Sequence, residues 1–95
     1  MSRPEEIKID VSEVDTASHL HQLLFDALSF PDYYGSNWDA FWEVISSEDV
    51  LPERLVIHGW KTLEQKLPRE AELMRRCLSD YKEERPEQTC RVVYA

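Results

Sequence analysis

Two carboxylates near the middle of the chain, Asp39 and Glu43, are four residues apart in an unusually aromatic segment. Residues 31 to 43 contain five aromatic side chains and three carboxylates. On a helix, residues at i and i+4 lie one turn apart on the same side. Such a pair can accept hydrogen bonds from an arginine of a protein partner, hold a divalent cation, or carry out acid–base chemistry.

An enzyme is the weaker of these interpretations. Catalysis needs a nucleophile, base or metal ligand that converges with the pair in one pocket. His19 and His21 are two residues apart on an expected helix, so they point about 200° apart and cannot chelate one ion. His58 ends an apolar strand, where a core or edge role is more common. The two glycines, Gly35 and Gly59, make no glycine-rich phosphate loop. We therefore expect no catalysis, cofactor or metal, with a carboxylate-based metal-dependent enzyme as the less favoured alternative.

A protein-binding surface is the favoured interpretation. Tyrosine and tryptophan supply rigid contact area, and exposed carboxylates accept bidentate hydrogen bonds from arginine. Tyr33 lies on an expected turn and is predicted to face a partner, whereas Tyr34 is predicted to lie in the core. For Trp42 the two roles are equally open, because an aromatic residue at the edge of an apolar stripe can fill both.

The net charge of −8 narrows the class of partner. Residues 9 to 53 contain ten acids and no Lys or Arg, so the whole acidic excess falls there. Phosphate contacts need basic side chains, so we do not expect nucleic acid as a partner. A field of one sign speeds encounter with a cationic protein, although charge alone fits a solvated acidic face equally well. Homo-oligomerisation through this face is disfavoured because two copies would repel each other.

Length and composition indicate one domain over residues 1–95, with an ordinary globular balance of 42% apolar and 32% charged residues. No apolar run approaches the ~18 residues that a membrane span needs. The first six residues are polar and acidic, unlike a signal peptide. We therefore expect a cytoplasmic protein without membrane contact. Cys77 and Cys90 fall on separate expected elements and are predicted to be buried thiols rather than a disulfide.

The first third of the chain predicts a strand and a helix. Polar and apolar residues alternate over residues 6–11, which is typical of a strand with one buried face. Leucines then recur at helical spacing over residues 16–28, and Thr16 or Ser18 can act as the N-cap.

A loop over residues 29–36 follows, because Pro31 cannot continue the helix and Gly35 permits a left-handed turn. A second helix is expected after Asn37, a natural N-cap. Four residues of that helix form a stripe predicted to face the core: Trp38, Phe41, Trp42 and Ile45.

A polar turn over residues 46–53 precedes a short β-branched segment, residues 55–58, which predicts a buried central strand. Thr62 and Gln65 have the spacing of a capping box and predict a short helix.

A longer helix is expected from Pro68 to about Glu84, where Pro86 ends it. Its apolar face is predicted to consist of Ala71, Met74, Leu78 and Tyr81. A closing strand follows over residues 90–95. The resulting order, β-α-α-β-α-α-β, predicts an α/β fold with a three-stranded parallel sheet and about four helices, joined by right-handed connections.

The motif around the loop resembles the barstar family, intracellular inhibitors of barnase-type ribonucleases. The resemblance is carried by Leu20-His21-Gln22 and by residues 30–42, which contain the pattern Tyr-Tyr-Gly-x-Asn-x-Asp-Ala-x-Trp. The expected order of elements is also similar to the barstar-like fold. Outside residues 19–45 the similarity is one of pattern more than identity.

This resemblance implies a non-enzymatic inhibitor whose second helix enters a ribonuclease active site. It implies that Glu43 occupies the place of a substrate phosphate and that Asp39 also contacts the nuclease. The other positions that it implies as partner-binding are Tyr33, Asn37, Trp38 and Trp42, together with Asp80 on the long later helix, with Glu84 one turn further.

Two departures from the family pattern bear on the partner. Glu43 is one methylene longer than the aspartate of the family. Ser47-Glu48-Asp49 stands where the family has a glycine and apolar residues. We therefore expect a basic extracellular or toxin-type ribonuclease other than barnase, for which this chain is the immunity protein. A different basic nuclease toxin is the alternative.

Overall fold

The computed structural model describes residues 5–48, 50–87 and 90–95. The elements are, in order, β1 (Glu6–Asp10), α1 (Ala17–Leu28), α2 (Trp38–Ser47), β2 (Arg54–His58), α3 (Trp60–Lys66), α4 (Pro68–Glu84) and β3 (Arg91–Tyr94). This is the predicted order, with boundaries that differ by one or two residues; α2, for example, includes Ser46 and Ser47 of the predicted polar turn. The first four residues and Asp49, part of one departure from the family pattern, lie outside the described residues.

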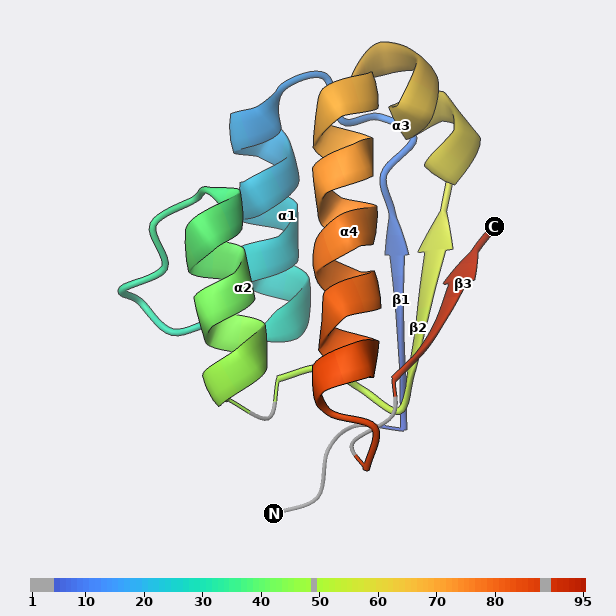
Figure 1. Cartoon of the computed structure of the whole chain (residues 1–95). Coiled ribbons are helices and arrows are strands. Elements are labelled where there is room, and N and C mark those ends of the chain that lie inside the picture. Colours follow the sequence, from blue (N-terminus) through green and yellow to red (C-terminus); the bar gives the residue numbers. More distant parts are fainter. Residues whose placement is uncertain (1–4, 49, 88–89) are drawn as a thin grey trace.

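The three strands form one parallel sheet with β2 in the centre. In this register Ile7 lies opposite Leu55, which lies opposite Val92. Leu55 is in the hydrophobic core, and its two neighbours pack against that core, so this row faces the helices. Figure 1 shows α1, α2 and α4 on one side of the sheet and α3 near the ends of β1 and β2. The predicted α/β fold, with four helices in the described part of the chain, is confirmed.

The long helix α4 packs on the core as predicted, since all four residues of its expected apolar face are buried. Helix α2 differs from the prediction. Its buried residues are Phe41, Val44 and Ile45, whereas Trp38 and Trp42 are only half-buried. The helix is rotated so that the small Val44 points inward, which moves both indole rings to the rim of the core. The predicted stripe is therefore incomplete, because it omits Val44, and both tryptophans pack against the core only in part, which fits the two roles left open for Trp42.

The N-caps of the first two helices are residues that the sequence predicts as caps. Thr16 Oγ1 accepts a hydrogen bond of 3.0 Å from the backbone N–H of His19. Asn37 Oδ1 accepts one of 2.8 Å from the backbone N–H of Ala40. These bonds satisfy N–H groups that have no partner within a helix, and they fix where α1 and α2 begin.

The sequence predicts a left-handed turn at Gly35, but the left-handed backbone conformation occurs at two other residues of the loop. Ser29 and Ser36 both have φ of 54°, whereas Gly35 does not have a positive φ. Gly35 is suited to its place for another reason. A Cβ there would lie 3.3 Å from Asn37 Nδ2, so the absence of a side chain leaves room for the residue that caps α2.

The predicted capping box at Thr62 and Gln65 is wrong. Helix α3 begins at Trp60, so Thr62 lies inside it, and its N-cap is Gly59 with φ of 77°. Glycine is required there for two reasons. The left-handed conformation disfavours other residues, and an added Cβ would lie 2.6 Å from the Cβ of Ser12. This close approach joins the end of β2 to the turn after β1.

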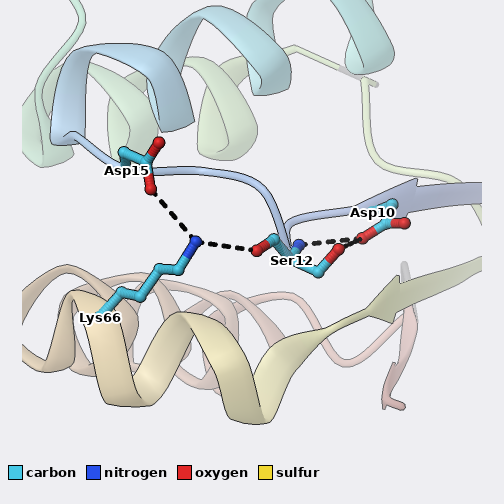
Figure 2. A network of polar contacts seen from close by, with 4 residues as sticks. All are labelled: Asp10, Ser12, Asp15 and Lys66. Atoms are coloured by element: carbon cyan, nitrogen blue, oxygen red, sulfur yellow. Dashed lines mark hydrogen bonds and ion pairs between the residues drawn. The ribbon is translucent and has the colours of Figure 1, made fainter.

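A polar network holds the same turn (Figure 2). Lys66 Nζ, at the end of α3, donates hydrogen bonds to the backbone oxygen of Ser12 at 3.2 Å and to Asp15 Oδ1 at 3.1 Å. Ser12 donates its hydroxyl and its backbone N–H to Asp10 Oδ1, at 2.6 and 2.9 Å. The Ser12 hydroxyl, followed by its N–H, holds the pKa of Asp10 below its ordinary value. The network connects β1, its turn and α3.

Both cysteines are thiols, which confirms that they do not form a disulfide. Cys90 is buried as predicted, whereas Cys77 on α4 is only half-buried. Within residues 5–48, 50–87 and 90–95, no helix is long and apolar enough to cross a membrane.

Candidate protein-binding site

Helix α2 exposes its side chains in a graded order from core to solvent. At about 100° per residue, the buried residues are followed around the helix by the half-buried indoles and then by the exposed carboxylates. In that order the side chains are Phe41, Ile45, Trp38, Trp42, Asp39 and Glu43. The carboxylates therefore stand beside a partly open aromatic surface. A partner that covers this edge would bury indole surface and meet negative charge together.

Trp38 is held by contacts to two other helices and to a residue of its own helix. Its Nε1 donates a hydrogen bond of 2.8 Å to Oε1 of Glu70 on α4. Its ring lies 4.4 Å from the ring of His21 on α1 and 5.2 Å from that of Phe41, measured between centroids. These contacts fix the first turn of α2 in the protein without a partner.

A buried histidine–tyrosine pair lies behind Trp38. His21 is 2% exposed, and its Nδ1 shares a hydrogen bond with the hydroxyl of Tyr34. Burial lowers the pKa of His21, with Glu70 opposing the shift, and burial raises the pKa of Tyr34. Both side chains are therefore neutral near pH 7 and join α1 to the loop before α2. The prediction that Tyr34 is a core residue is confirmed.

Two other predicted contact residues lie on that loop and at its end. Tyr33 is 67% exposed, so its ring is available to a partner. Asn37 is also exposed, but both polar atoms of its side chain are engaged locally: Oδ1 caps α2, and Nδ2 donates to the backbone oxygen of Gly35 at 3.1 Å. A structural role for Asn37 is therefore visible, and its contact with a partner stays a prediction.

Asp80 on α4 lies close to the start of α2. Between the two helices, Cys77 Sγ is 4.0 Å from the backbone oxygen of Trp38. Burial raises the pKa of the Cys77 thiol, and the negative charges of Asp80 and Asp39 raise it further. Asp80 follows Cys77 by one turn of α4 and Asp39 directly follows Trp38, so both carboxylates lie near the same contact between α2 and α4 although they are far apart in sequence.

The predicted carboxylates of this surface are free to meet a partner. Within the described part of the chain, no hydrogen bond or ion pair involves the carboxylate of Asp39, Glu43 or Asp80, and all three are exposed. We call Tyr33, Trp38, Asp39, Trp42, Glu43 and Asp80 the acidic aromatic surface.

The C-terminal end of α4 borders the acidic aromatic surface beside the last turn of α2. The Arg85 guanidinium donates a hydrogen bond to the backbone oxygen of Ser46, which ties the end of α4 to the last turn of α2. A shallow hollow of about 380 Å³ lies between them and is also lined by Trp42 and Glu84. The acidic aromatic surface therefore continues toward Glu84, as the resemblance implies.

The metal-dependent alternative finds no support in the arrangement of ligands. Among residues 5–48, 50–87 and 90–95, no three His, Cys, Asp or Glu side chains gather in a way that could hold a metal ion. His21 is buried against Tyr34, whereas His19 is exposed, so the two histidines face different ways as predicted.

The fold is that of a small α/β domain, and the acidic aromatic surface is formed on it in the absence of a partner. The chain belongs to the barstar family, since the family model described as barstar (barnase inhibitor) matches residues 5–95. The resemblance stated from the sequence is thereby confirmed, and the family implies a ribonuclease as protein partner.

A protein of Bacillus subtilis (strain 168) is also similar to this chain. Its name is "Putative ribonuclease inhibitor YrdF", and it is 40% identical over 55 residues. The matched region makes up 58% of this chain and 60% of that protein. The chain therefore spans about 60% of the length of this relative.

Proposed function

We propose that this chain is a non-enzymatic inhibitor that blocks the active site of a basic ribonuclease with helix α2. The observation that carries the proposal is the set of exposed carboxylates without a partner among the described residues, placed beside half-buried indoles: Asp39, Glu43 and Asp80 beside Trp38 and Trp42. A ribonuclease cleft holds cationic groups that bind the phosphates of RNA. Carboxylates that stand at those places would occupy the cleft and exclude the substrate.

Each predicted residue has a distinct part in this proposal. Glu43 enters the cleft as the phosphate mimic, and Asp39 and Asp80 pair with cations on either side. Tyr33, Asn37, Trp38 and Trp42 supply contact area around these charges. Family membership and the relative named as a ribonuclease inhibitor both support a ribonuclease partner.

The proposed partner is an extracellular or toxin-type ribonuclease other than barnase, and the chain would act as its immunity protein in the cytoplasm. Glu43 and the polar residues Ser47 and Glu48 support a partner other than barnase, because they change the reach and polarity of the helix relative to the family pattern. The same features leave a different basic nuclease toxin as the second candidate.

A titration against a barnase-type ribonuclease tests this proposal, with RNA cleavage followed at low and high salt. We expect inhibition at near-stoichiometric amounts that weakens as salt rises, because salt screens the attraction between the two fields. Inhibition of equal strength at both salt concentrations would contradict the electrostatic mechanism. If no inhibition occurs at a large excess of the chain, barnase-type enzymes are excluded, and purified basic nuclease toxins are titrated in the same way.

A further inference from the structure

A second surface lies between α4 and β3, away from the acidic aromatic surface. A groove of about 570 Å³ is lined there by residues of both elements, including Arg75, Leu78 and Lys82 on α4 and Val92 on β3. At about 100° per residue, these α4 residues point roughly 100–160° away from Cys77, which faces α2. The groove and the acidic aromatic surface are therefore on different sides of α4.

The groove is cationic in a chain whose net charge is −8. Arg75, Lys82 and Arg91 line it, and no Asp or Glu does. Arg75 is already engaged by Glu64 Oε2 at 3.1 Å and lies over the ring of Tyr94 at 5.1 Å. Lys82 and Arg91 are exposed, and in the described part of the chain no ion pair or side-chain hydrogen bond involves either of them. Two cationic side chains are therefore available to a ligand.

The wall of the groove opposite α4 is an edge strand. β3 pairs only with β2 in the described sheet and is seen at its margin in Figure 1. The backbone N–H groups of Arg91 and Ala95 donate toward β2, at 2.8 and 2.9 Å. Successive residues of a strand alternate in direction, so Val92 and Tyr94 turn their backbone N–H and C=O groups to the open edge. Both residues also line the groove.

We propose that this groove binds an extended acidic peptide segment of a partner protein, which adds to β3 as a further strand. The open backbone groups of Val92 and Tyr94 supply main-chain hydrogen bonds, as in other cases of strand addition. Lys82 and Arg91 pair with acidic side chains of the peptide. Val92 and the ring of Tyr94, which is 36% exposed, contact its apolar side chains. Nucleic acid is not the occupant, because two available cations in an acidic chain neutralise too few phosphates.

The proposal is tested with a library of random hexapeptides selected for binding to the full chain. Two double variants are compared: Lys82→Glu with Arg91→Glu in the groove, and Lys61→Glu with Arg69→Glu as a control of equal charge change at exposed positions outside it. We expect selected peptides to be enriched in Asp and Glu. They should bind the wild type and the control alike, and the groove variant at least about tenfold more weakly. Denaturation curves establish that both variants fold.

Two further readouts distinguish strand addition from nonspecific attraction. Peptide binding should slow hydrogen exchange at the amides of Val92 and Tyr94, and methylation of alternate peptide amides should abolish binding. The proposal is overturned if the selected peptides are not acidic, if both double variants bind them equally, or if methylated peptides bind as well as the parent. Self-association that the groove variant loses would identify a second copy of the chain as the occupant and would also overturn it. Because ribonuclease inhibition involves other residues, it should be equal in the groove variant and in the charge-matched control.

Discussion

The indole Nε1 of Trp38 donates a hydrogen bond of 2.8 Å to Oε1 of Glu70, and this bond joins the first turn of α2 to the first turn of α4. The ring of the same tryptophan packs on His21 of α1. Trp38 therefore has a fixed position before any partner is bound. Such preorganisation reduces the side-chain entropy that is lost on association.

Replacing Glu70 tests this relationship. Glu70→Ala leaves the half-buried indole N–H without its acceptor, so we expect the free energy of unfolding to fall by about 1 kcal/mol and ribonuclease binding to weaken. Glu70→Gln keeps an acceptor oxygen and should retain most of both. Urea denaturation and inhibition titrations measure the two effects, with Glu72→Ala as an exposed control on the same helix. Equal losses in the Ala and Gln variants would show that the hydrogen bond contributes little.

The buried His21 should make stability depend on pH. Burial lowers its pKa in the folded protein below the ordinary value of 6.5, so the unfolded chain takes up a proton first as the pH falls. The contribution of His21 to stability is therefore fully present above about pH 6.5 and is lost below it. In denaturation curves from pH 8 to 5, His21→Gln should weaken this decline, whereas His19→Gln, at an exposed position, should not. If stability declines equally with falling pH in the two variants, His21 is not the cause of the pH dependence.

The contact between Gly59 and Ser12 should make position 59 intolerant of a side chain. Gly59→Ala combines a left-handed φ of 77° with a Cβ that would lie 2.6 Å from the Cβ of Ser12. We expect a loss of about 2–4 kcal/mol in the free energy of unfolding. Gly35→Ala is the matched control, because Gly35 lacks a positive φ and an added Cβ would lie 3.3 Å from Asn37 Nδ2. A similar loss in both variants would contradict this explanation.

The features that sequence predicts well are local ones. The caps at Thr16 and Asn37 and the first turn at Pro68 depend on residues within one turn of each other, so their chemistry decides the helix starts. At α3, Thr62 and Gln65 offer the same local signal, but the tight approach of Gly59 to Ser12 sets the helix start instead. A contact between distant segments therefore outweighs the local preference.

Long-range contacts also decide the details of the candidate site. Nothing in the local sequence indicates that Trp38 bonds to Glu70, 32 residues away, or that Val44 rather than an indole faces the core. The burial of His21 is predictable from the sequence, because His21, Leu24 and Leu28 share one face of α1. Tyr33 and the carboxylates of α2 are exposed, as the sequence pattern predicts.

Tyr33 should matter for binding but not for folding. Its ring is 67% exposed, so Tyr33→Ala should change the free energy of unfolding by less than about 0.5 kcal/mol. The same change should weaken ribonuclease binding by more than about 1 kcal/mol, because an interface tyrosine supplies rigid contact area. Glu87→Ala, an exposed change outside the acidic aromatic surface, should leave binding unaltered. Calorimetric titration of both variants decides the matter: if they bind alike, the loop is outside the interface.

Glu43→Ala should cause the largest loss of ribonuclease binding among the single changes in α2. It leaves cationic groups of the partner buried without an anion, which costs about 2–5 kcal/mol, a range drawn in part from the barnase–barstar complex itself. Folding should not suffer, since Glu43 is exposed and the change removes repulsion from Asp39 one turn away.

Two conservative variants separate the causes of that loss. Glu43→Gln keeps the length but not the charge, so it should bind almost as weakly as the alanine variant if the carboxylate replaces a phosphate. Glu43→Asp keeps the charge but is one methylene shorter, so it should bind more tightly than both if charge matters more than reach. Inhibition constants at two salt concentrations measure the series. A loss below about 1 kcal/mol for Glu43→Ala would place Glu43 at the rim of the interface, because rim residues typically contribute that little.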